Sequence, residues 1–137
     1  MRASEIELEI TESYIATDAK QAIKDLQKFR DMGISISIDD FGTGYSSMSY
    51  LQKLPVTRLK VDKSFMDGIP DSQENIAIVK AILALAQTFN LSVTAEGVET
   101  KEQVDFLQKE QCEEIQGYFY SKPLSLEDLK EYCKNTQ

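Results

Sequence analysis

Polar side chains lie at or near the carboxyl ends of several predicted strands, where they could act together on one substrate. They are Glu9, Asp39, Asp40, Lys60, Glu96 and Gln116. A single acid in such a place is usually a helix cap or part of a solvated loop. Carboxylates from neighbouring strands can instead share two divalent cations about 4 Å apart, which clamp a phosphoryl oxygen and lower the pKa of a bridging water. The repeated pattern therefore favours metal-assisted hydrolysis of a phosphate ester.

The adjacent acids Asp39 and Asp40 follow an alternating segment, residues 34–38, that is typical of a strand. Successive strand residues point to opposite faces, so both carboxylates reach one point only if the backbone bends there. Gly42 and Gly44 permit such a bend. An isolated Asp-Asp pair is more often a solvated turn, and it is the acids at the other strand ends that favour a metal site.

Lys60 lies among these acids on a predicted central strand. It could orient the attacking water or stabilise negative charge in the transition state, and it could equally be a structural partner that neutralises the acids. A different enzyme class also fits the residues. Under this hypothesis Lys60 is the base that abstracts a proton next to a carboxylate of the substrate, and the acids hold a magnesium ion.

Composition excludes several kinds of chemistry. The chain has no histidine, which removes Ser-His and Cys-His nucleophile pairs and nearly all catalytic zinc sites. Oxygen ligands alone point to Mg²⁺ or Mn²⁺ as cofactor, or to Ca²⁺ if the site is structural. A net charge of -8 argues against binding of polymeric nucleic acid by a basic surface.

The sequence predicts a single globular domain over residues 1–137, with 42% hydrophobic residues available for a core. No apolar run approaches the roughly 20 residues of a membrane span, and the N-terminus lacks a signal-peptide pattern, so we expect a cytoplasmic protein. Cys112 and Cys133 are too few for a disulfide framework, and we expect both to be reduced and structural.

Strand and helix patterns alternate along the chain. We expect strands over residues 6–10, 34–39, 58–62, 91–96 and 114–118. We expect helices over residues 18–32, 72–89, 100–109 and 125–133, and a short one before Pro55 capped by Ser46 and Ser47. The first long helix should bury Ala19, Ala22, Ile23, Leu26 and Phe29. This order predicts the α/β class, with parallel strands whose carboxyl ends form the active-site rim.

Five motifs in this chain resemble, in the same order, those of EAL domains. They are Leu8 to Ser13, Asp39 to Ser47, Leu59 to Asp62, Ala95 to Glu99, and Gln116 to Tyr118 with Ser121 to Leu124. EAL domains include the cyclic di-GMP phosphodiesterases, which adopt a modified (β/α)8 barrel. The resemblance implies hydrolysis of cyclic di-GMP to linear pGpG with Mg²⁺ or Mn²⁺.

The resemblance also implies a role for each matching residue. Glu9 and Asp39 would hold one metal, and the second would be held by Asp39, Asp40 and Glu96. Lys60 would contact the hydrolytic water, so that Lys60, Glu96 and Asp40 form the catalytic set, and Gln116 would lie beside the substrate. Supporting residues would be Glu12, Glu99, Thr43 and Gly44, with Glu12 holding the loop from residue 41 to 47 that also feeds the family's dimer contact.

The resemblance starts part-way into the family's pattern. The Glu-Ala-Leu segment and a later asparagine, both metal ligands in the family, have no counterpart here. Five strands cannot close an eight-stranded barrel, so we expect a partial TIM-type barrel without its N-terminal strands and with an unpaired edge. We therefore expect self-association, as a homodimer or higher, through that edge or through the loop after Asp40. A non-catalytic fragment or interaction module is the alternative function.

Overall fold

The computed structural model describes residues 1–44 and 48–136, and its centre is a five-stranded parallel sheet. The strands are β1 (Glu7–Thr11), β2 (Ser35–Phe41), β3 (Arg58–Val61), β4 (Ser92–Ala95) and β5 (Glu114–Ile115). Each strand pairs in parallel with the next one along the sequence, in the order β1-β2-β3-β4-β5. The predicted α/β class is confirmed, as are all five strands. Among the described residues, β1 pairs only with β2 and forms one edge of the sheet.

Helices connect the strands. They are η1 (Ala3–Glu5), α1 (Glu12–Thr17), α2 (Ala19–Asp31), α3 (Met48–Leu51), α4 (Lys63–Met66), α5 (Gln73–Thr88), α6 (Lys101–Lys109) and α7 (Leu126–Asn135). The four long helices were predicted, and the capping box of Thr100 and Gln103 at the start of α6 is confirmed. The expected caps Ser46 and Ser47 lie outside the described residues. Helices α1 and α4 were missed because six and four residues are too short to show apolar periodicity.

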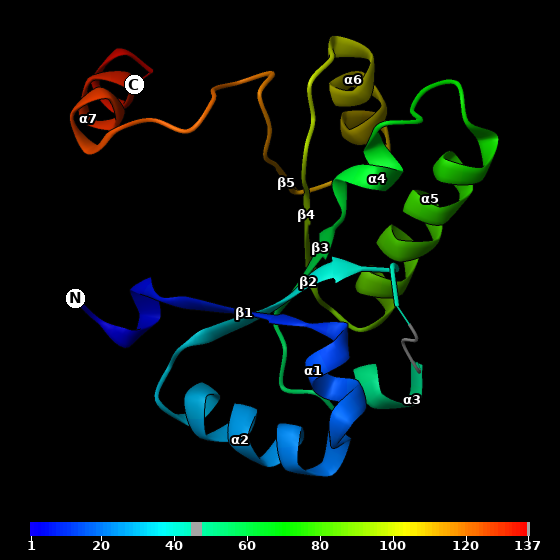
Figure 1. The fold of residues 1–137 in the computed structure, drawn as a ribbon, viewed down its shortest axis with the longest axis vertical. Helices are drawn as coiled ribbons and strands as arrows, with labels where there is room; N and C mark the ends of the chain where they lie inside the picture. Colours follow the sequence, from blue (N-terminus) through cyan, green and yellow to red (C-terminus); the bar gives the residue numbers. More distant parts are fainter. Residues whose placement is uncertain (45–47, 137) are drawn as a thin grey trace.

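Alternate strand residues separate the core from a polar face. Leu8, Ile36, Ile38, Leu59, Val61, Val93 and Ala95 share one side, and all but Leu8 are buried, against side chains of α2, α5 and α6. Figure 1 shows α2 and α5 lying alongside the sheet. The prediction that Phe29 is part of the core is wrong, because its side chain is 39% exposed. Ala22 and Leu26 of the same helix are buried.

The opposite side of the same strands carries charged and polar residues. In register across the sheet, Glu9 pairs with Ser37, Ser37 with Arg58 and Arg58 with Ser92. One step further towards the carboxyl ends, Lys60 pairs with Thr94. TIM-barrel interiors are usually filled by bulky branched side chains, so a charged inner face marks a region where stability is not the main requirement.

The C-terminal segment is set apart from this core. Figure 1 shows α7 at the end of an extended stretch, separated from the other helices. All described residues of α7 are exposed, including the apolar Leu126, Leu129 and Tyr132. Cys133 is exposed as well, so the expectation that it is a structural residue is wrong, whereas Cys112 is partly buried against the core; both are free thiols. In the part of the chain that the structure describes, no helix is both long and apolar enough to cross a membrane.

Candidate active site

Three carboxylates meet at the carboxyl ends of β2 and β4. Asp39, Asp40 and Glu96 each offer one oxygen, and these three oxygens lie within 4.8 Å of one another. Asp39 and Asp40 lie just before Phe41, the last residue of β2, and Glu96 directly follows β4. The strand between them, β3, brings Lys60 to the same place. Oxygen atoms at this spacing suit a hard divalent cation such as Mg²⁺ or Mn²⁺.

An irregularity in β2 allows the neighbouring aspartates to converge. The pairing of β2 with β3 shifts register between Ile38 and Phe41, and Asp40 adopts a φ of 53°. That left-handed backbone is uncommon outside glycine and breaks the alternation that would otherwise aim the two side chains apart. The bend expected at Gly42 and Gly44 therefore begins two residues earlier, at Asp40 itself, and continues through Gly42 with a φ of 94°.

Lys60 joins acids from three strands. Its Nζ lies 2.5 Å from Glu9 Oε1, 2.8 Å from Glu96 Oε1 and 3.7 Å from Asp39 Oδ1. Burial works against the charge of this 8% exposed side chain, but the hydrogen bonds that Lys60 donates to Glu9 and Glu96 outweigh it and raise the pKa of Lys60 above its ordinary value. Lys60 is therefore an ammonium ion, and Glu9 belongs to the site through it.

Two acids of the cluster, Glu96 and Asp40, hold their protons more strongly than free carboxyls do. Burial raises the pKa of Glu96, and the charges of Asp39 and Glu9 add to the effect, whereas Lys60 opposes it. Desolvation likewise raises the pKa of Asp40, assisted by the charges of Asp39 and Asp62. Crowded carboxylates without a cation repel one another, and a bound divalent ion would relieve that repulsion.

Glu12 ties the loop after the aspartates to α1. Its side chain is buried, and its Oε1 accepts a hydrogen bond of 2.8 Å from the backbone N–H of Gly42. A Cβ at Gly44 would lie 2.6 Å from Glu12 Oε2, so a larger residue there would displace the Glu12 carboxylate. The Thr43 hydroxyl donates to the Asp40 carbonyl at 2.7 Å, which fixes the turn. Residues 45–47 lie outside the described part of the loop.

Glu99 and Gln116 border the cluster without joining its ion pairs. Glu99 Oε1 accepts a hydrogen bond of 2.9 Å from Lys63 Nζ, which also binds Asp67. Gln116 is exposed, and its backbone N–H donates to the Ala95 carbonyl at 2.8 Å. That bond places Gln116 beside the residue that precedes Glu96. Both positions are at the rim on which the acids converge.

Comparison with known proteins assigns this arrangement to a family. Residues 1–123 match the EAL domain family. The chain belongs to the EAL domain family. It is 50% identical over 129 residues to the cyclic di-GMP phosphodiesterase NbdA of Pseudomonas aeruginosa, an alignment that spans 94% of this chain and 16% of NbdA.

Solved EAL structures share the fold. The PaMucR phosphodiesterase in complex with c-di-GMP superposes with a TM-score of 0.91 at 43% identity, over 94% of this chain and 52% of the PaMucR chain. The Klebsiella pneumoniae BlrP1 complex with manganese and cyclic di-GMP matches with a TM-score of 0.83 at 34% identity, over 90% of this chain and 31% of that one. This EAL chain thus has the fold of part of a TIM-type barrel and spans about half of the PaMucR structure.

Sequence reasoning missed one acid of this EAL domain. Asp62 follows β3, and its carboxyl group hydrogen-bonds with that of Asp40. Hydrogen bonds that Asp62 accepts from Ser64 are the main reason that the pKa of Asp62 is lowered. Its position directly after a strand is the same signal that identified the other acids.

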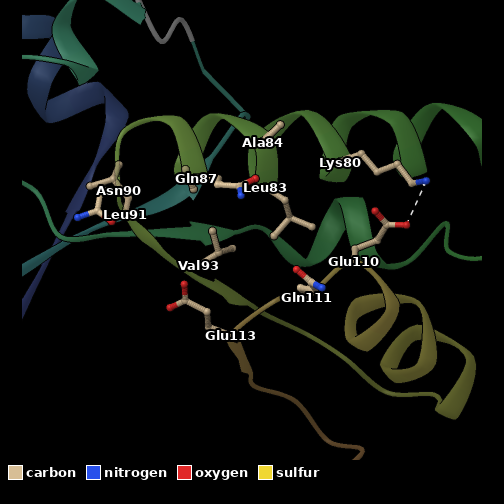
Figure 2. Close-up of a pocket in the computed structure, with 11 residues that line it drawn as sticks. Lys80, Leu83, Ala84, Gln87, Asn90, Leu91, Val93, Glu110, Gln111 and Glu113 are labelled. Carbon is tan, nitrogen blue, oxygen red and sulfur yellow. Dashed lines mark ion pairs between the residues drawn. The ribbon is translucent and has the colours of Figure 1, made fainter.

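A separate pocket lies at the other end of the sheet. Figure 2 shows it between α5 and the segment that follows α6. The volume of the pocket is about 380 Å³. Val93, at the start of β4, is among the residues that line it, and a 3.1 Å ion pair joins Lys80 to Glu110 beside it. None of the residues expected to bind metal or substrate lines this pocket, so it is distinct from the acidic rim.

Proposed function

We propose that this chain forms the metal-binding part of a cyclic di-GMP phosphodiesterase and takes part in metal-dependent hydrolysis of cyclic di-GMP to linear pGpG. The observation that carries the proposal is the convergence of Asp39, Asp40 and Glu96 around the Lys60 ammonium at the strand ends. Family membership and the names of the relatives support the choice of substrate.

The residues of the rim fit a divalent cation. They offer only carboxylate oxygens, and the rim carries more negative charges than Lys60 can neutralise. Such a surface repels a phosphodiester unless cations are present. We propose that Glu9 and Asp39 hold one Mg²⁺ or Mn²⁺, and that Asp39, Asp40 and Glu96 hold a second. When bound, these ions would activate water as the nucleophile and polarise the phosphoryl group.

In this proposal Lys60 works as a charged hydrogen-bond donor. Because its pKa is raised, it cannot accept a proton at neutral pH, which argues against an enzyme that uses Lys60 as the base beside a carboxylate substrate. Two of its N–H groups face Glu9 and Glu96, which hold the ammonium at the rim. A third N–H remains to orient water or to stabilise charge on a phosphoryl oxygen.

The neighbouring residues would complete the site. Gln116, exposed at the rim beside β4, would contact the substrate. Glu12, through its hydrogen bond to Gly42, would hold the loop whose conformation sets the position of Asp40. Glu99, paired with Lys63, would hold the segment after Glu96 in place.

Chromatography of cyclic di-GMP incubated with the 137-residue chain and MnCl₂ tests the proposal. We expect pGpG to form, and we expect the product to disappear with EDTA and in Asp39→Asn. Lys80→Met, which changes a charge far from the rim, is the matched control and should keep the activity. Absence of pGpG with the folded, metal-loaded chain would exclude catalysis by this polypeptide alone.

A second candidate is an interaction module without catalysis. The edge strand β1 and the exposed apolar residues Leu126, Leu129 and Tyr132 of α7 favour it, because both could bind a second copy of the chain or the rest of a barrel. In that case the chain should self-associate, and light scattering of the concentrated protein would show a mass above 15.5 kDa. A monomer that hydrolyses cyclic di-GMP would count against this candidate.

A further inference from the structure

A second group of charges lies on the same face of the sheet, towards the amino ends of the strands. Arg58 Nε on β3 lies 3.3 Å from Glu7 Oε2 on β1, an ion pair without a hydrogen bond, and the guanidinium also forms an ion pair with Glu114 on β5. Its guanidinium donates a further hydrogen bond of 3.0 Å to Thr94 on β4. The Arg58 side chain is 22% exposed, and none of the site roles proposed above involves it.

The Arg58 group repeats the geometry of the Lys60 group one layer lower. Arg58 and Lys60 are two residues apart on β3 and so share a face, as do Glu7 and Glu9 on β1. Each cation pairs with an acid on β1 and with an acid beyond β3, which is Glu96 after β4 for Lys60 and Glu114 on β5 for Arg58. Layers of a TIM barrel are built from alternate strands, and Glu7, Arg58 and Glu114 belong to the alternate strands β1, β3 and β5.

We infer that Arg58 is a positioning residue, which draws β1 and β5 towards β3 so that the acids one layer above converge on Lys60 and the proposed cations. This inference rests on the proposed metal site. The planar guanidinium presents donors in several directions and can hold two carboxylates from different strands at once, whereas a lysine ammonium is a compact point charge. Glu9 gains most from this support, because β1 pairs with a single strand in the described part of the chain.

A simple electrostatic effect predicts the opposite result. Removing Arg58 makes an acidic chain more acidic, from a net charge of -8, and by Coulomb attraction alone should tighten the binding of a divalent cation. If Arg58 positions the acids, its removal should weaken binding, because supporting residues around metal ligands contribute about tenfold or more to affinity. The sign of the change therefore separates the two explanations.

Calorimetric titration of the full chain with MnCl₂, well below its melting temperature, measures that sign. We expect Arg58→Met to weaken Mn²⁺ binding about tenfold, and Arg58→Lys to recover part of the loss. Lys80→Met is the matched control, since it removes one positive charge whose partner is Glu110 and should not weaken binding. Unchanged or tighter binding by Arg58→Met would overturn the inference.

A measurement without metal keeps the inference testable if the parent chain fails to bind Mn²⁺, a result that would refute the proposed function instead. Glu9→Gln should lower the melting temperature of the parent, because it removes the 2.5 Å contact with Lys60. In the Arg58→Lys background, which keeps the charge, we expect a clearly smaller loss, because Glu9 is no longer held in reach. Equal losses in the two backgrounds would show that Arg58 does not position Glu9.

Discussion

On β3, Leu59 and Val61 point towards the helices, whereas Arg58 and Lys60 point to the opposite face. Leu59 and Val61 are fully buried among apolar side chains, and the two cations form ion pairs with acids on or next to other strands. The same four residues thus contribute to the core and to the candidate site in alternation. A change on one side should therefore alter stability with little effect on chemistry, and a change on the other side should do the reverse.

The largest expected effect is on the polar side. We expect Lys60→Met to lower the rate of cyclic di-GMP hydrolysis about 1000-fold, because it removes a positioned charged donor from the rim. Chromatographic assay of pGpG with MnCl₂ measures the rate, and circular dichroism should show a folded chain. A rate within twofold of the parent would assign Lys60 to structure alone.

The matching change on the apolar side is Leu59→Ala. Leu59 is fully buried, so the truncation should lower the free energy of unfolding by about 3 kcal/mol through lost burial and a cavity. Urea titration checks that loss, and Mn²⁺ affinity measured under folding conditions should stay within about twofold of the parent. A large loss of Mn²⁺ affinity in this variant would show that the two faces are not separable.

A smaller effect is expected in the pH dependence of the chain without metal. The pKa of Asp40 is raised, so the unfolded chain loses this proton first, and stability falls as pH rises from the ordinary aspartate value of 3.8 to the pKa of the folded state. Glu96 adds a change of the same sign above 4.5. The Asp40→Asn variant should lack the part of this loss of stability that Asp40 causes.

Melting temperatures measured across this pH range with EDTA test the pH prediction, with Asp105→Asn as an exposed control far along α6. Saturating MnCl₂ should reverse the slope, because ionised carboxylates bind the cation and protonated ones do not. If the melting temperature of the EDTA-treated parent rises through this pH range by more than that of Asp40→Asn, the result contradicts a raised pKa of Asp40.

The smallest effect is expected outside the sheet. Leu129 on α7 is 46% exposed, so Leu129→Ser should change the free energy of unfolding by no more than about 0.5 kcal/mol. Urea titration of the dilute chain measures the change. A loss of several kcal/mol, or a fall in the mass of the particle in sedimentation, would show that another surface covers this face of α7.

Much of the site could be predicted because strand ends of a parallel sheet meet at one rim. The strands, and the placement of Asp39, Asp40, Lys60 and Glu96 at their carboxyl ends, follow from alternation in the sequence. The left-handed backbone of Asp40 could not be predicted from the sequence. Its φ of 53° depends on how β2 pairs with β3, and no glycine at this position signals it.

Contacts between residues far apart in the chain could not be predicted from the sequence either. The hydrogen bond of Asp62 to Asp40 and the ion pairs of Arg58 with Glu7 and Glu114 depend on register between strands. Nor does periodicity measure how far a helix face is covered, which explains the exposure of Phe29 on α2. The roles of Glu9, Gln116 and the supporting residues remain proposals, and Glu9→Gln addresses the first of them.

Calorimetric titration of the parent chain and of Asp39→Asn with MnCl₂ tests most directly whether acids from separate strands form a cation site. The account predicts saturable binding by the parent and an affinity at least about 100-fold weaker in Asp39→Asn, since Asp39 is placed between both proposed ions. Equal binding by the two proteins, or none by the folded parent, would contradict it.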